Sequence, residues 1–203
     1  IPPGVERMIV PAAADAWMTA LIEHGTMSFE QVVTPALEYA RDGIAVGVKL
    51  AATMANFAEE ADQWPTRTEA YTTEGKFPGL GERLQQPALA RTFERLVEVE
   101  KKNTSLGREQ AIQAARDFFY KGEIAEEIVD FVKKGGGFLS MSDMADFSVG
   151  HEAPETGTFN EYEVYTNGPW CQGPAFAETV QLLAGDDLKK MGHNTADYIH
   201  LVA

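Results

Sequence analysis

The chain has a single cysteine and little positive charge. Cys171 has no second cysteine to pair with, so no internal disulfide stabilises the fold. Seventeen lysines and arginines stand against 31 aspartates and glutamates, which gives a formal net charge of −14. Such a chain lacks the basic surface that binds nucleic acid or anionic lipid, so neither is expected as a partner.

Long apolar runs are also missing. No stretch of about 18 apolar residues occurs, and no membrane span is therefore predicted. Residues 1–4 have neither the basic nor the apolar part of a secretory signal, and they do not include methionine. Because residues 201–203 fall inside a helical pattern, we expect a piece of a longer protein. Its compartment stays open.

The composition and the periodicity are those of a helical globular protein. With 203 residues, 44% of them hydrophobic, the chain is large enough to bury a core. Apolar residues at helical spacing predict helices over residues 11–24, 28–43, 50–61, 108–120, 123–134 and 175–183, another from residue 87, a short turn after Ser142 and a last helix capped by Asn194.

Local signals refine this prediction. Ser28 and Gln31 have the spacing of a capping box, and Pro35 predicts a kink or a break in the helix that follows. Alternating polarity favours strands over residues 147–155 and 161–166, and glycine and proline favour loops over 64–83 and 168–174. The predicted fold is mainly α with a small β component, and residues 1–203 form one helix-rich portion.

Cys171 is a candidate nucleophile. It precedes Gln172 and Gly173 at a turn before a helix, where the positive helix end would lower the pKa of the thiol. No signature of a cysteine hydrolase surrounds it, and no histidine can be assigned as its base. A small packing residue is the favoured interpretation.

Three other groups also have ordinary explanations. His193 and His200 are seven residues apart, but helix capping and packing explain them without a metal. The acidic residues of 123–130 suit the start and the solvent face of a helix. Residues 135–137, all glycine, lack the lysine of a P-loop and end a helix. The sequence thus predicts no catalytic, cofactor or metal site of its own.

Six segments follow one another in an order typical of one family. They are 10–17 (VPAAADAW), 24–29 (HGTMSF), 35–43 (PALEYARDG), 86–92 (QPALART), 119–125 (FYKGEIA) and 136–145 (GGFLSMSDMA). Together they span most of the chain, which resembles the γ-glutamyltransferase family of N-terminal-nucleophile hydrolases over part of the large-subunit region.

The resemblance implies a fold and a chemistry for the full-length protein. Members form an α+β, αββα sandwich and cleave themselves so that a threonine begins the small subunit. That threonine attacks a γ-glutamyl amide such as that of glutathione, and its own amine serves as the base. The threonine lies beyond the matched region, and the arginine for the substrate carboxylate lies before it. No catalytic residue is therefore assigned here, and the expected partners are the small subunit and the amide substrate, without a cofactor.

One segment departs from the family. Where members have PPPSSGG, residues 167–174 read NGPWCQGP. The strand, turn and helix remain, but the chemistry of the turn differs, which predicts a divergent branch. An amidohydrolase for another small acyl amide is one alternative, and a helical binding or scaffold protein is the other. Hydrolysis versus transpeptidation and the oligomeric state stay open.

Overall fold

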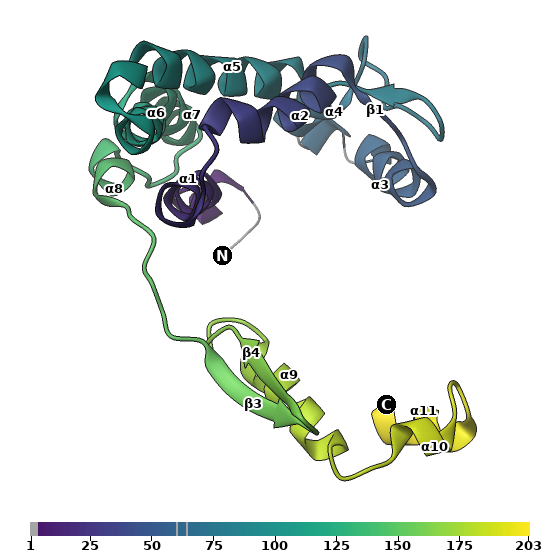
Figure 1. The fold of residues 1–203 in the computed structure, drawn as a ribbon. Helices are drawn as coiled ribbons and strands as arrows, with labels where there is room; N and C mark the ends of the chain where they lie inside the picture. The colour runs from purple at the N-terminus through teal and green to yellow at the C-terminus, as the bar shows by residue number, and fades with distance from the viewer. Residues whose placement is uncertain (1–3, 60, 64) are drawn as a thin grey trace. The chain divides into compact units, whose positions relative to one another are not determined.

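The computed structural model describes residues 4–59, 61–63 and 65–203. The chain divides into two compact units, the first ending at Val149 and the second running from Gly150 to Ala203. Each unit is described by itself (Figure 1). Parts of the predictions for residues 1–4, 50–61 and 64–83 concern positions 1–3, 60 and 64, which lie outside the described residues. That 1–203 form one portion of a longer protein stays a prediction.

Unit 1 is built from helices, as the periodicity predicts. Its α-helices are α1 (Ala13–His24), α2 (Phe29–Asp42), α3 (Val48–Glu59), α4 (Pro65–Tyr71), α5 (Pro87–Lys102), α6 (Arg108–Lys121), α7 (Glu123–Lys134) and α8 (Met141–Asp146). Short 3-10 helices are η1 (Val5–Arg7), η2 (Ala61–Gln63) and η3 (Thr104–Leu106). Two-residue strands β1 (Ile44–Ala45) and β2 (Arg83–Leu84) pair antiparallel. The mainly helical class with a small β component is confirmed.

Helix α2 begins with the predicted capping box. The Ser28 hydroxyl accepts a hydrogen bond from the Gln31 amide at 3.1 Å, and the Gln31 side chain accepts one from the Ser28 amide at 2.9 Å. Both bonds satisfy N–H groups that the first helical turn leaves unpaired. Pro35 lies inside α2 without breaking it, so of the two predicted effects the break is wrong.

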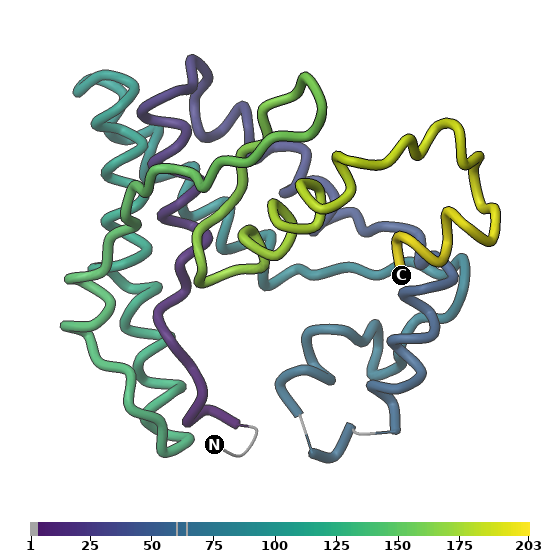
Figure 2. The backbone as a smooth tube through the Cα atoms, turned by 90° about the horizontal axis from the view of Figure 1, so that it is seen from below, coloured from purple at the N-terminus to yellow at the C-terminus, as the bar shows by residue number. Residues whose placement is uncertain are grey.

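Two apolar clusters form the core of unit 1. The first joins α1, α2, α5, α6 and α7 through Met18, Phe29, Val33, Leu96, Val97, Ile112, Ala115 and Ile124. The second joins α6, α7 and α8 through Tyr120, Ala125, Val129, Val132, Leu139 and Met144. In Figure 2 the purple N-terminal segment lies beside the green helices, and Val5 contacts Gly135 and Gly137 so closely that a β-carbon on either glycine would collide with it.

The predicted loop over residues 64–83 is wrong in part. Helix α4 occupies Pro65–Tyr71, and β2 begins at Arg83. The Phe57 ring on α3 packs edge-on against Tyr71 at 5.5 Å and against Phe77 at 6.5 Å between ring centroids. These long-range contacts hold a segment whose glycines and prolines favour turns.

Unit 2 is an antiparallel hairpin followed by helices. Strands β3 (Glu155–Phe159) and β4 (Tyr162–Thr166) pair over their full length, and α9 (Gly173–Leu183) packs on β3. Gly157 lies against Ala177 and Gln181 of α9, and a β-carbon there would lie 3.0 Å from the Gln181 side-chain amide, which would have to shift slightly. Short helices α10 (Leu188–Met191) and α11 (Ala196–Val202) complete the unit. The β4 prediction is confirmed.

Several predicted boundaries are wrong: α3 begins at Val48, α8 at Met141 and α9 at Gly173, each ahead of its predicted start. Residues 147–154 are not a strand, because Phe147 and Val149 bond to side chains of unit 1 instead of to a neighbouring strand. The last helix is capped by Thr195, whose hydroxyl accepts from the Tyr198 amide at 3.3 Å, while Asn194 takes a left-handed φ of 57°. Helix α1 begins at Ala13 and not at Pro11. None of the described helices is both long and apolar enough to cross a membrane.

Candidate functional site

Cys171 lies in the turn between β4 and α9. Its amide donates to the Gly168 carbonyl at 3.1 Å, and its thiol is exposed. The interpretation of Cys171 as a small packing residue is therefore wrong. The turn itself is tight, because a β-carbon on Gly173 would lie 1.9 Å from the Asn167 carbonyl oxygen. The Trp170 indole N–H donates to the Glu152 carboxylate at 2.6 Å and holds the other side of the turn.

The acidic residues lie as their ordinary explanation requires, but the capping and packing expected of the two histidines are wrong, because Thr195 caps α11. His193 and His200 are exposed, and the His193 ring lies 6.1 Å from that of Tyr198. Among the described residues no group of three or more histidine, cysteine, aspartate or glutamate side chains is placed to hold a metal ion. Glu123 and Glu127 on α7 pair with Arg95 on α5 at 3.1 and 2.9 Å. The predicted solvent face of α7 is confirmed.

The glycines at 135–137 end α7, as predicted. Gly135 is the C-cap, and Gly136 takes a φ of 84°, a conformation that favours glycine. The Gly137 amide donates to the Val132 carbonyl at 2.8 Å and closes the helix end. These residues stop a helix.

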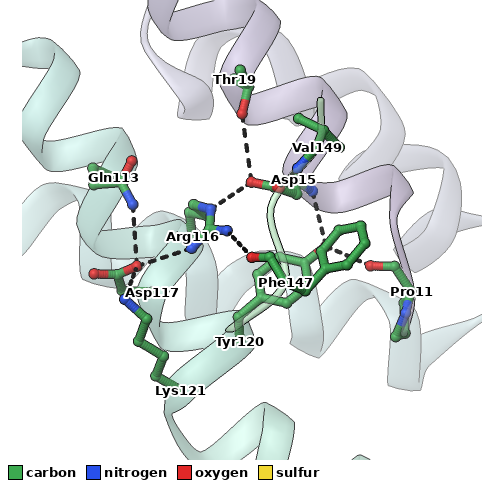
Figure 3. Close-up of polar contacts among 10 residues, drawn as sticks. All are labelled: Pro11, Asp15, Thr19, Gln113, Arg116, Asp117, Tyr120, Lys121, Phe147 and Val149. Atoms are coloured by element: carbon green, nitrogen blue, oxygen red, sulfur yellow. Dashed lines mark hydrogen bonds and ion pairs between the residues drawn. The ribbon is translucent and has the colours of Figure 1, made fainter. Parts of the chain in front are cut away.

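A buried polar network lies where sequence analysis assigned no function (Figure 3). The Asp15 side chain on α1 is 1% exposed and accepts from Nε of Arg116 on α6. Its other oxygen accepts from the Val149 amide at 2.7 Å. The Thr19 hydroxyl makes a longer bond of 3.4 Å to the first oxygen. The carboxylate is thus paired with charge and hydrogen-bonded, as a buried charge must be.

Tyr120 and Arg116 complete this network. The Tyr120 hydroxyl donates to the Pro11 carbonyl and accepts from the Asp15 amide, the latter at 3.0 Å. Arg116 donates through Nη2 to the Phe147 carbonyl at 2.6 Å, and its guanidinium lies 5.0 Å from the Tyr120 ring centroid. The hydrogen bond to Asp15 raises the pKa of Arg116, and burial raises the pKa of Tyr120.

Two further side chains complete helix ends. The buried Glu100 carboxylate on α5 accepts from the Phe29 and Glu30 amides of α2 at 2.7 and 2.8 Å. Arg108 on α6 donates to the Leu21 and Ile22 carbonyls at the end of α1, each at 2.9 Å. An anion at the positive end of a helix and a cation at the negative end are both favourable. These side chains make the relative positions of the helices specific.

An apolar groove of about 470 Å³ crosses unit 1. Its lining comes from the start and one face of α1, from α2 and α5, and from one residue of α6: Pro11, Ala13, Ala14, Trp17, Met18, Leu21, Phe29, Val32, Val33, Ala36, Leu89, Thr92, Phe93, Leu96 and Phe119. Trp17 is 65% exposed and Val32 is 50% exposed, although both follow helical apolar spacing. Among the described residues that line the groove, Thr92 is the one polar side chain, and none is an acid or a base.

The helical fold and the six sequence segments between residues 10 and 145 together define the class of protein. The chain belongs to the gamma-glutamyltranspeptidase family, whose model matches residues 2–203. Within it, the glutathione hydrolase proenzyme of Escherichia coli strain K12 is 29% identical over 195 residues, which are 95% of this chain and 31% of that protein. The acylase ACY 1 proenzyme of Pseudomonas sp. strain SE83 is 24% identical over 201 residues, covering 98% and 33%.

Comparison of structures agrees with the sequence match. The crystal structure of Helicobacter pylori gamma-glutamyltranspeptidase matches with a TM-score of 0.80 at 21% identity, over 98% of this chain and 53% of that chain. A match at this identity shows that the chain shares the fold of the matched part of that protein. The chain spans about a third of the length of the curated relatives it matches.

Proposed function

We propose that this chain is the helical wall in the large-subunit region of a self-cleaving γ-glutamyl hydrolase or transferase. The observation that carries the proposal is the apolar groove, which lies open along α1, α2 and α5. Membership of the family supports it, as does the length of the relatives, about three times that of this chain. In this account the remaining polypeptide supplies the sheets that cover the groove.

The exposed side chains of the groove fit this role. Trp17 and Val32 are apolar, follow the core spacing of their helices and remain largely exposed. Covering one aromatic side chain of this size contributes about 2–3 kcal/mol at 25 cal/mol per Å². An apolar face rimmed by polar residues is typical of a surface that a further layer of the protein covers.

The chemistry in this proposal belongs to the rest of the protein. A threonine freed by self-cleavage attacks the γ-carbonyl of the substrate, and an ester to the glutamyl group forms as the amine leaves. The amine of the same threonine takes up the hydroxyl proton, so no histidine is required. Water or an amino acid then releases the acyl group. In this proposal residues 1–203 support the sheets that carry the active site, and they contribute no reacting group.

The test compares the full gene product that contains this chain with residues 1–203 alone. Self-cleavage is followed on denaturing gels, and hydrolysis of γ-glutamyl-p-nitroanilide is followed by absorbance. We expect cleavage and turnover from the full product and neither from residues 1–203. Absence of cleavage in the full product overturns the proposal and favours the helical binding protein.

One segment of the chain favours a second candidate function, with a substrate that carries a different acyl group. Residues 167–174 depart from the family's PPPSSGG, and the turn they form is held by the Trp170 to Glu152 bond. A relative that this chain matches is an acylase proenzyme. The alternative is therefore an amidohydrolase that cleaves another small acyl amide. Cleavage of the precursor without γ-glutamyl turnover, together with hydrolysis of a non-glutamyl acyl amide, would establish it.

A further inference from the structure

Unit 2 has almost no apolar core of its own. Among its described residues, Ala177 is the one hydrophobic side chain that is buried. Larger apolar side chains stay at the surface, and Tyr162, Phe176 and Leu182 are each more than half exposed. A two-stranded hairpin is marginally stable by itself, and a unit of this size needs a well-packed core to fold alone. Unit 2 therefore needs packing beyond what its own residues supply.

Helix α9 covers more than the hairpin beneath it. It packs mainly on β3 and less on β4, with Ala177 and Gln181 against Gly157, and Figure 1 shows it along one face of the hairpin. A helix with its side chains is about 10 Å wide, whereas neighbouring strands lie about 4.8 Å apart. Because α9 lies over β3, one side of the helix extends beyond the outer edge of that strand.

A groove of about 430 Å³ lies between that side of α9 and β3. Two residues of β3 and one side of α9 form its lining: Glu155, Thr156, Pro174, Ala177, Glu178, Gln181 and Leu182. None of these described lining residues belongs to β4. The groove is therefore on the outer side of β3, where the next strand of a larger sheet would run.

The outer edge of β3 presents backbone hydrogen-bonding groups. Phe159 and Tyr162 flank a two-residue turn, so they form a hydrogen-bonded pair, and such pairs alternate along an antiparallel ladder. Thr156 and Thr158 fall in the intervening pairs, so their N–H and C=O groups point away from β4. The described sheet has two strands, with β4 as the partner on the inner edge of β3.

The outer edges of the two strands differ in charge. Glu163 lies directly opposite Thr158, at the equivalent outward-facing position of β4, and a charge in the middle of an edge strand discourages pairing. The Glu163 carboxylate also accepts from the Tyr165 hydroxyl on the same strand at 2.8 Å. The outward-facing positions of β3 hold β-branched threonines, which favour strand pairing. A further strand is therefore accepted more readily beside β3 than beside β4.

We propose that the groove beside β3 receives an extended strand from polypeptide outside residues 1–203. The inference rests on the proposed function, in which the remaining polypeptide supplies sheets, and the curated relatives are about three times as long as this chain. Backbone bonds to Thr156 and Thr158 hold the strand, and its alternate side chains cover Leu182 on α9. The hairpin thereby becomes part of a sheet of three or more strands with α9 on one face.

Amide hydrogen exchange in the wild-type full gene product tests the pairing. We expect the Thr158 amide to exchange about tenfold more slowly than the Glu163 amide, or slower still, because only Thr158 gains a hydrogen bond from the new strand. The Val164 amide, in the hydrogen-bonded pair with Gly157, shows that the hairpin is formed. Exchange at Thr158 as fast as at Glu163, with Val164 protected, would overturn the proposal.

Photo-crosslinking identifies the origin of the strand. A benzoylphenylalanine residue replaces Thr156, which lines the groove, and mass spectrometry identifies the peptide to which it links. We expect a peptide from outside residues 1–203, with less of that product when the probe replaces Tyr165, the residue opposite on β4. A linked peptide from within residues 1–203, of the same or of a second copy, would contradict the proposed origin.

The two proposals fail in different ways. Self-cleavage on denaturing gels tests the proposed function, whereas exchange at Thr158 tests the strand. A cleaved product in which Thr158 exchanges as fast as Glu163 overturns the strand alone. An uncleaved product in which Thr158 is protected overturns the proposed function and supports the strand.

Discussion

Asp15 and Arg116 are 101 residues apart in the chain and form a buried ion pair between α1 and α6. Their side chains are 1% and 10% exposed, and their contacts reach Val149 and Phe147 at the end of unit 1 as well as Thr19 and Asp117 on their own helices. The pair joins the start of α1, the middle of α6 and the end of the unit. It organises the helical core in a way that apolar packing alone does not specify.

Neutralising Asp15 should destabilise unit 1. Asp15→Asn removes the buried charged partner of Arg116 and leaves its guanidinium only the more exposed Asp117, and breaking a buried pair costs about 3–5 kcal/mol. Urea denaturation followed by circular dichroism measures the change. Arg41→Gln, which breaks the exposed pair of Arg41 with Asp42, should leave the midpoint unchanged. An equal loss of stability in the two variants would show that burial of the ion pair does not determine its contribution to stability.

Tyr120→Phe should destabilise unit 1 and alter its response to alkali. The variant leaves the Pro11 carbonyl and the Asp15 amide without their partner, at a cost of about 1–3 kcal/mol. Tyr39→Phe changes an exposed hydroxyl and should be neutral. Denaturant titration at neutral pH measures both effects.

The pH dependence follows from the sign of the Tyr120 shift. Burial raises the pKa of Tyr120 above its ordinary value of 10.0, so the folded state keeps a proton that the unfolded state has lost. Its contribution is complete below pH 10 and is lost as the pH rises through the folded pKa. The stability difference between the wild type and Tyr120→Phe should therefore shrink above pH 10. A difference that grows there would contradict the account.

Glu100→Gln should weaken the junction of α5 with α2. The neutral amide is a poorer acceptor for the Phe29 and Glu30 amides and loses the favourable interaction with the helix end, so we expect a loss of about 1–2 kcal/mol. Glu98→Gln on the exposed side of α5 is the control, with no change expected. Thermal melts of both variants decide this, and an unchanged melting temperature for Glu100→Gln would refute the capping role.

If the rest of the polypeptide covers the groove, a substitution in it should affect the stability of the full gene product but not that of residues 1–203. Trp17→Gln should leave the stability of residues 1–203 nearly unchanged, because the side chain is 65% exposed there. In the full gene product the same change should lower the melting temperature, because the side chain loses its apolar cover. Leu106→Gln, also exposed but outside the groove, should be neutral in both proteins. Neutral Trp17→Gln in the full product would show that nothing covers the groove.

Local signals predicted most of the helices, and contacts distant in sequence account for most errors. The Ser28 capping box and the amphipathic run of α7 can be recognised within a few residues. Helix α4 depends on Phe57, and the extended segment at Phe147 depends on side chains of α1 and α6, so neither has a local signal. Asp15 lies in segment 10–17, which resembles the family, but nothing in the sequence identified Arg116 as its ion-pair partner.

We propose that this chain is one wall of a self-cleaving protein. Mass spectrometry of the purified full gene product tests it most directly, by giving the N-terminal residue of every polypeptide present. We predict two polypeptides, with residues 1–203 inside the larger one and threonine as the first residue of the smaller. A single uncleaved polypeptide, or a smaller one that begins with a residue other than threonine, would contradict the claim.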